Sequence, residues 1–168
     1  DIKKESIKED QKTFVDALED TFHFAMIIAY AQGMHMLSRA SDEYGYELKL
    51  HEIAKIWRGG CIIRSEFLND IYNAYNNNQQ LGHLLLDEQV KNLVSSLLPS
   101  VRKVISSAVN SGIAVPAYTS ALSYFDAFRT ARLPSNLIQA QRDYFGSHTY
   151  ELIGKEGVFH TQWTGKNV

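Results

Sequence analysis

The sequence predicts an all-α fold: a multi-helix domain followed by an extended C-terminal tail. Apolar residues recur at helical spacing along most of the chain, as at Phe14, Leu18 and Phe22. The strict alternation of apolar and polar residues that marks strands is scarce. Glycine or proline separates most of the periodic segments. Together these observations favour helices joined by short connections.

The first helix is expected to run from about Asp10 to Tyr44. Its first turns carry the stripe named above, and from Phe22 onward nearly every face is apolar. A helix that is apolar all round is typically buried on all sides. Gly45 is expected to end it, because glycine readily adopts the left-handed conformation found at helix ends.

A short second helix is expected over Leu50–Trp57, ended by the pair Gly59 and Gly60. A third is expected over Ile62–Asn76, where large apolar residues follow helical spacing. The polar run Asn76–Gln80 then predicts a loop.

Asp87 is expected to cap a fourth helix that continues to Asn110 and closes at Gly112. Pro99 lies inside this pattern. Because proline lacks the backbone N–H and clashes with the preceding turn, we expect it to kink or split this helix.

Pro116 can open a fifth helix that runs to about Arg132, since proline is favoured in the first turn. Ser135 is then expected to cap a last helix that reaches Tyr144. Helical periodicity is lost after Gly146. We therefore predict a helical domain over residues 1–146 and an irregular tail over 147–168. The tail is too apolar for a free disordered segment, so it should dock on this chain or on another.

Composition narrows the class of protein. The chain has 168 residues, of which 45% are hydrophobic and 21% charged, which suits one soluble domain. A net charge of -2 without a long basic run argues against nucleic-acid binding. The longest apolar stretch, Phe24–Ala31, is far shorter than the roughly 20 residues that cross a bilayer. No signal sequence is visible, and the start at Asp1 suggests a cut inside a longer chain.

The single cysteine, Cys61, excludes an internal disulfide and fits a reducing, cytoplasmic compartment. We favour a small buried hydrophobe over a catalytic thiol, because nothing in the sequence specifies a base for it. The six histidines show no metal-ligand spacing, so no metal site is expected. His23 and His35 are expected to be hydrogen-bonded core or interface residues. Arg58 and Arg64 bracket the Gly59–Gly60 joint, and structural partners are favoured there over an anionic ligand.

Arg142 and His148 are the best candidates for binding a small anion. They lie six residues apart with Gly146 between them, and glycine would permit a sharp change of direction. An arginine fork fits phosphate or carboxylate at two points, and histidine adds a second donor. The alternative is a surface arginine paired with Asp143 or a neighbour, and a solvated loop histidine. The residues alone leave both interpretations open.

Several long motifs resemble 6-phosphogluconate dehydrogenase. They are W-R-G-G-C-I-I-R-S at 57–65, L-P-S-N-L-I-Q-A-Q-R-D-Y-F-G-S-H-T-Y-E at 133–151, Y-A-Q-G at 30–33, G-I-A-V-P at 112–116 and F-H-T-Q-W-T-G at 159–165. The likeness covers roughly residues 14–166. It implies the later half of that family's helical domain plus its tail.

The resemblance implies NADP-dependent oxidation and decarboxylation of 6-phosphogluconate to ribulose 5-phosphate, a step of the pentose phosphate pathway. It implies a homodimer in which the tail docks on the partner subunit. Arg142 and His148 match the family's substrate-binding arginine and histidine, which reach into the partner's active site, the arginine chiefly at the phosphate. Ser147 stands where alanine is common, which should not disturb this assignment.

The same resemblance implies that the parts of the enzyme that bind NADP and perform catalysis lie outside this chain. The family's NADP-binding domain and its catalytic lysine and glutamate have no counterpart here, and no glycine-rich phosphate loop is present. We expect no catalytic residue, no bound cofactor and no dehydrogenase activity from this chain alone. Two other hypotheses stay open: a non-catalytic helical module for dimerisation or partner binding and, less favoured, a hydrolase or transferase that uses Cys61 or His148.

Overall fold

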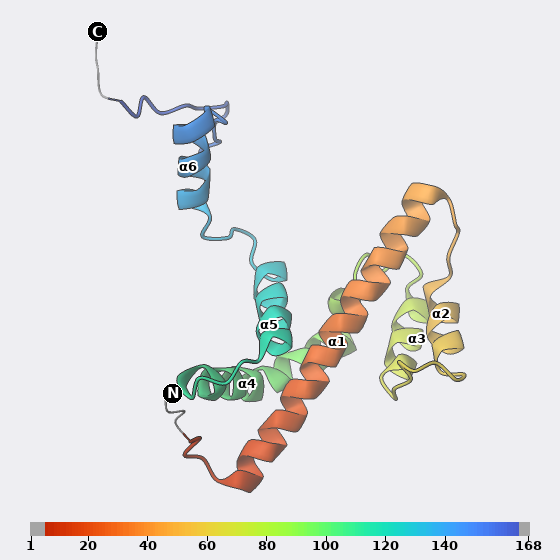
Figure 1. Ribbon diagram of the computed structural model, residues 1–168. Helices are drawn as coiled ribbons and strands as arrows, with labels where there is room; N and C mark the ends of the chain where they lie inside the picture. The colour runs from red at the N-terminus through yellow and green to blue at the C-terminus, as the bar shows by residue number, and fades with distance from the viewer. Residues whose placement is uncertain (1–5, 165–168) are drawn as a thin grey trace. The chain divides into compact units, whose positions relative to one another are not determined.

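The computed structural model describes residues 6–164. The described part of the chain is helical, and its helices are α1 (Gln11–Tyr44), α2 (Leu50–Trp57), α3 (Leu68–Asn77), the 3-10 turn η1 (Leu84–Leu86), α4 (Glu88–Asn110), α5 (Pro116–Phe128) and α6 (Asn136–Gly146) (Figure 1). Within these residues the only β-type pairing is an isolated antiparallel bridge between Tyr150 and Phe159. The predicted all-α fold is confirmed.

The chain forms two compact units, residues 1–126 and 127–168, with the boundary near the end of α5. The first unit contains α1 to α4, η1 and most of α5. The second contains α6 and the tail. Each unit is described below by itself.

Helix α1 begins and ends where the sequence predicts. The Asp10 carboxylate accepts a hydrogen bond from Thr13 N at 3.0 Å and so caps the first turn. Gly45 follows the helix with φ 65°, in the left-handed conformation, and its N–H bonds the Ser41 carbonyl. Both signals are local, which explains why the helix ends could be predicted from sequence.

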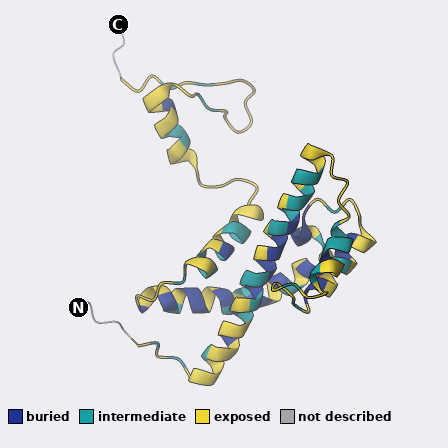
Figure 2. Cartoon of the chain, turned by 45° about the vertical axis from the view of Figure 1, so that its right-hand side comes forward, coloured by how far each residue is buried: buried dark blue, intermediate teal, exposed yellow. Residues whose placement is uncertain are grey.

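One face of α1 forms the core of the first unit. Buried side chains recur on it at helical spacing and pack with α4, η1 and the α2–α3 pair (Figure 2). The fully buried set includes Phe24, Ile27, Ile28, Ala31 and Met34 from α1 and Val90, Val94 and Val101 from α4. The expectation that α1 is buried on all sides is wrong for the single chain. Phe22 is 62% and Met36 66% exposed, because the core elements cover only one side of the helix.

The α2 bounds match the prediction, but the predicted start of α3 at Ile62 is wrong. Residues 62–67 form turns, and α3 begins at Leu68. The physical reason is tertiary. The Tyr30 hydroxyl on α1 donates to the Ile63 carbonyl. This carbonyl therefore accepts a hydrogen bond from a distant residue instead of one within a helix. Ile62 is left fully exposed.

Helix α4 is capped by Asp87, whose carboxylate accepts from Gln89 N at 3.0 Å and Val90 N at 3.1 Å. Pro99 does not split it, contrary to one of the two expected outcomes. Packing holds the helix across the proline, since Val101 is buried and Ser100 Oγ donates to Asp20 of α1 at 2.6 Å.

Helix α5 stops at Phe128, short of the predicted Arg132, and α6 extends to Gly146, past the predicted Tyr144. Ser135 is the N-cap of α6, but its side chain makes no capping bond. Among the described residues, none of the helices combines the length and the apolarity that spanning a membrane requires.

Candidate functional site

Arg142 lies exposed on α6, and the structure does not pair it with a carboxylate within residues 6–164. Its Nη1 donates to the Gln139 Oε1 atom at 3.2 Å. The Gln139 amide in turn donates from Nε2 to the Thr149 carbonyl at 2.5 Å. One glutamine therefore connects the Arg142 guanidinium with the backbone next to His148.

His148 lies over the end of α6. A Cβ atom added at Gly146 would stand 2.9 Å from His148 Nε2 and 3.0 Å from Cδ2. The imidazole therefore fills the space where any other residue at 146 would place its side chain. Arg142 and Gly146 are four residues apart on one helix and so share a face. The ring of His148 therefore lies against Gly146, one helical turn beyond Arg142.

The expected role of Gly146 needs a correction. It is the last residue of α6, and the left-handed backbone belongs to Ser147, with φ 51°, and Thr149, with φ 61°. The chain thus turns at two residues other than glycine. Glycine is needed at 146 because the imidazole of His148 occupies the position of a side chain.

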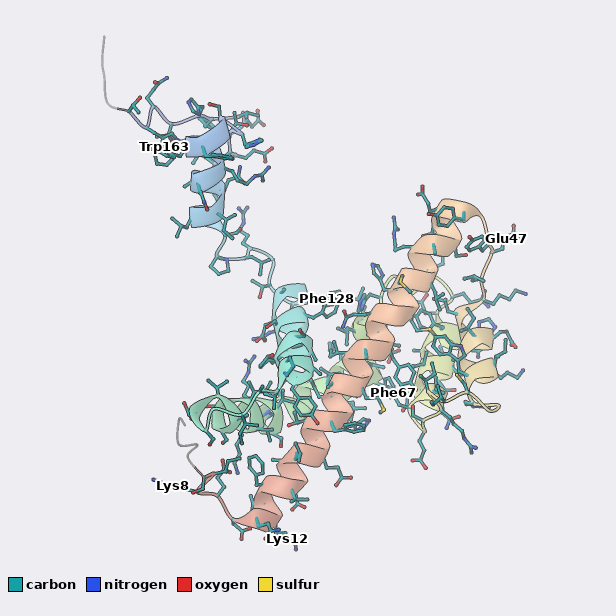
Figure 3. The ribbon with its side chains drawn as sticks, in the orientation of Figure 1. Lys8, Lys12, Glu47, Phe67, Phe128 and Trp163 are labelled. Atoms are coloured by element: carbon teal, nitrogen blue, oxygen red, sulfur yellow. The ribbon has the colours of Figure 1, made fainter. Side chains whose placement is uncertain are left out.

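Asp143 is fully buried and organises the second unit. Its Oδ1 accepts from Thr149 N at 3.0 Å and His160 Nδ1 at 2.8 Å, and its Oδ2 accepts from Thr161 N at 3.0 Å and Trp163 Nε1 at 2.9 Å. Figure 3 shows Trp163 beside α6. The carboxylate therefore fastens the tail to the helix and does not pair with Arg142. Arg142 instead bonds a neighbour, Gln139, as the alternative interpretation also allows.

Burial alone raises the pKa of the Asp143 carboxyl, because desolvation disfavours its charge. Hydrogen bonds from Thr161, His160 and Trp163 act in the opposite direction and outweigh burial. Together these effects lower the pKa of Asp143 from 3.8 to about 2. The group is thus charged at neutral pH in a site with donors on both oxygens.

A hollow of about 510 Å³ lies between α6 and the tail. Gln139, Tyr150, Thr161 and Trp163 are among the residues that line it. Arg142 and His148 stand outside this hollow, on the exposed surface of the unit. The pair can therefore meet a ligand presented by another surface, and by itself it forms an open site.

The other candidate residues contact side chains or backbone of the protein itself. Arg58 bonds the Asn69 side chain and lies 5.9 Å from the Tyr72 ring centroid, so it joins α2 to α3. His35 is half-buried and its Nδ1 lies 3.1 Å from the Gly82 carbonyl, so it is hydrogen-bonded as expected. His23 meets the Phe67 ring edge-on.

Arg64 lines a shallow polar hollow together with Lys55 and Arg58. Cys61 is half-buried and free, rather than fully buried as expected. No group of three or more metal-ligating side chains occurs in the part of the chain that the structure describes.

Sequence reasoning missed Asp143, His160 and His83 as structural residues. His83 is buried, accepts from Leu85 N at Nδ1 and lies 2.9 Å from the Tyr124 hydroxyl through Nε2. Desolvation first, and then the charge of His35, lowers the pKa of His83 from 6.5 to about 4. No local sequence pattern marks these residues, because their partners are distant along the chain.

The fold defines an all-α helical module that carries an exposed arginine and an exposed histidine at the end of α6. The sequence profile "6-phosphogluconate dehydrogenase, C-terminal domain" matches residues 1–163. The chain belongs to the 6-phosphogluconate dehydrogenase family, which confirms the resemblance noted in its motifs.

Comparison with individual relatives supports the same family. The chain is 50% identical over 157 residues to the NADP(+)-dependent, decarboxylating 6-phosphogluconate dehydrogenase of Bacillus subtilis (strain 168), covering 94% of this chain and 34% of the relative. It is 47% identical to the decarboxylating enzyme of Staphylococcus aureus (strain N315), covering 95% of this chain and 34% of the relative.

A solved structure shows the same fold. The Plasmodium falciparum 6-phosphogluconate dehydrogenase, described in apo form and in complexes with NADP+ and 6-phosphogluconate, superposes with a TM-score of 0.88 at 44% identity. The match covers 97% of this chain and 35% of that one. The chain thus spans about a third of the length of these relatives.

Proposed function

We propose that this chain acts as the C-terminal part of an NADP-dependent, decarboxylating 6-phosphogluconate dehydrogenase of the pentose phosphate pathway. In this role it supplies substrate binding and dimerisation. The observation that carries the proposal is the exposed Arg142–His148 pair at the end of α6, in a chain that belongs to this family. A cytoplasmic location fits the lone free thiol of Cys61.

In this proposal Arg142 binds the phosphate of 6-phosphogluconate. One donor of its guanidinium bonds the neutral amide of Gln139, and no carboxylate among residues 6–164 pairs with it, so the rest of the fork is available. Hydrogen bonds to charged groups contribute about 1.5–3 kcal/mol each, and the two-point geometry of arginine suits a phosphate. His148 adds a donor one turn away and orients the sugar acid or its phosphate.

The chemical step is assigned to residues outside this chain. NADP, when bound, accepts the hydride during oxidation at C3, before carbon dioxide leaves. The glycine-rich loop that typically binds a dinucleotide does not occur in this sequence, so NADP binding is assigned to the part of the enzyme outside this chain. The chain's own contribution is to hold the phosphorylated end of the substrate, and it is expected to be inactive alone.

We also propose that the chain forms a homodimer that covers two apolar surfaces. In the first unit a groove of about 630 Å³ runs along α1, lined by Phe22, Met26, Ala29 and Gly33, with Ile62 at its side. Ile62 is fully exposed. Contiguous exposed apolar surface commonly marks an interface with another protein.

The second apolar surface is the outer side of α6. Leu137 is 81%, Ile138 61% and Phe145 83% exposed, and Arg142 lies beside them. Docking of this face and the tail on a partner subunit would place Arg142 and His148 at an active site of the partner. The rival hypothesis, a non-catalytic dimerisation or partner-binding module, explains the apolar surfaces but assigns nothing to the exposed pair.

Calorimetric titration tests the substrate-binding proposal directly. A complete dehydrogenase in which this chain follows the upstream two thirds of a relative should bind 6-phosphogluconate far more tightly than gluconate, since the phosphate supplies the charge that Arg142 recognises. Arg142→Ala should abolish the heat of binding. Equal binding of both compounds, or binding that survives this substitution, would favour the module without a substrate site.

A further inference from the structure

The backbone on both sides of His148 is held by a single residue. Ser147 N donates to the Asp143 carbonyl at 2.9 Å, and Thr149 N donates to Asp143 Oδ1 at 3.0 Å. Ser147 and Thr149 both have left-handed φ values, which cost conformational free energy in residues other than glycine. Such a conformation persists where surrounding bonds impose it. Asp143 therefore fixes where His148 stands.

The same carboxylate also holds the tail. His160 Nδ1, Thr161 N and Trp163 Nε1 all donate to it, at 2.8, 3.0 and 2.9 Å. Asp143 has no exposed surface, so these bonds are shielded from water. Loss of the tail contacts would leave a buried carboxylate short of donors, which is unfavourable unless the site opens. Seating of the tail and placement of His148 thus depend on one group.

We propose that Asp143 is a positioning residue, which couples the seated tail to the Arg142–His148 pair and so sets the affinity for the phosphorylated substrate. The proposal rests on the proposed function of that pair. Asp143 itself touches no ligand, because all its oxygen atoms are occupied and buried. It acts through the backbone of Ser147 and Thr149 on the imidazole between them.

Gly146 provides a second, independent route to the same imidazole. An added Cβ would lie 2.9 Å from His148 Nε2, a distance that forces the ring to move. His148 is exposed, so its imidazole can move to another position without disturbing the Asp143 carboxylate. Gly146→Ala should therefore displace His148 while the four bonds to Asp143 remain.

The experiment uses a complete dehydrogenase in which this chain follows the upstream two thirds of a relative. Asp143→Asn replaces one oxygen by an NH2 group that faces backbone or ring N–H donors, so at least one of the four bonds is lost. The KM for 6-phosphogluconate should rise tenfold or more, toward about a hundredfold if the imidazole moves by an ångström. Trp163→Phe removes one bond and retains an aromatic ring, although a smaller one, so a smaller rise is expected. Gly146→Ala should also raise this KM.

A purely structural role would lower the amount of active enzyme, and hence kcat, without raising one KM selectively. A positioning role instead raises the KM for 6-phosphogluconate selectively. The KM for NADP should then stay unchanged in all three variants. Asp42→Asn is the matched control, because Asp42 is an exposed carboxylate paired with Arg39 at 3.5 Å. It should leave every constant unchanged.

Unchanged KM for 6-phosphogluconate in folded Asp143→Asn and Trp163→Phe enzymes would overturn this inference, provided that Arg142→Ala raises it. Should Asp143→Asn fail to fold, Trp163→Phe decides alone by the same criterion. If Arg142→Ala has no effect on that KM, the proposed function itself fails, which separates the two ideas.

Discussion

His160 Nδ1 lies 2.8 Å from Asp143 Oδ1, and this bond joins the tail to α6 across 17 residues of chain. The carboxylate accepts, so Nδ1 carries the proton. The contact illustrates how the second unit is built. A short helix with a largely exposed surface is combined with an irregular tail through one buried charged group, rather than through an extensive apolar core.

The contacts that hold the tail against α6 should weaken at acid pH. The pKa of Asp143 is lowered to about 2 in the folded state, below its ordinary value of 3.8. Its contribution to stability is therefore complete above about pH 3.8 and is lost as pH falls toward 2. The indole N–H signal of Trp163 in NMR spectra should shift through this range. A signal that is insensitive to pH between 4 and 2 would contradict the assigned bond.

The first unit should lose stability at a milder pH. The pKa of His83 is lowered to about 4 in the folded state, so the unfolded state binds the proton more readily. The free energy of unfolding should fall as pH drops from 6.5 toward 4, by up to about 3 kcal/mol from this group. Urea denaturation at a series of pH values measures this slope. His83→Gln should flatten it, and an unchanged slope would argue against a neutral, buried His83.

Arg142→Ala in a complete dehydrogenase should raise the KM for 6-phosphogluconate far more than the KM for NADP. Loss of a two-point, charge-assisted contact corresponds to a change of tenfold or more. Arg142→Lys should recover only part of the affinity, because lysine offers a point charge in place of a planar fork. Steady-state kinetics with both substrates measures the effect. Equal increases in both KM values would count against a phosphate contact.

The core of the first unit offers a matched pair of valines on α4. Val94 has no exposed surface, whereas Val109 is 63% exposed. Val94→Ala should lower the free energy of unfolding by about 1.5–3 kcal/mol, and Val109→Ala should change it by no more than about 0.5 kcal/mol. Chemical denaturation of both variants provides the measurement. Similar effects at the two sites would mean that the packing of α4 is not as described.

The groove on α1 should be a dimer interface. Sedimentation at micromolar concentration is expected to show a dimer, and Phe22→Glu should convert it to a folded monomer by placing a charge in the groove. Val109→Glu is the control, since it adds the same charge at an exposed position outside the groove. A well-folded monomer of the unmodified chain would refute the homodimer.

Local signals determined most helix bounds. Asp10, Gly45 and Asp87 act through hydrogen bonds and backbone conformations within a few residues, and the structure confirms each of them. The candidate pair could also be selected from sequence, since Arg142 and His148 combine suitable donors near a helix end. The role of Gly146 was predicted incorrectly, because the sequence does not reveal that the ring of His148 lies over it.

The tertiary structure decided the remaining features. Residues 62–67 leave the helical pattern because Tyr30, more than 30 positions earlier, binds the Ile63 carbonyl. Asp143 looks like an ordinary surface residue in the sequence, yet donors from as far as Trp163 surround it. Sequence patterns report interactions between near neighbours, whereas the burial of a charge is stable only when distant segments supply its partners. For that reason the helices could be read from the chain, and the group that holds the tail could not.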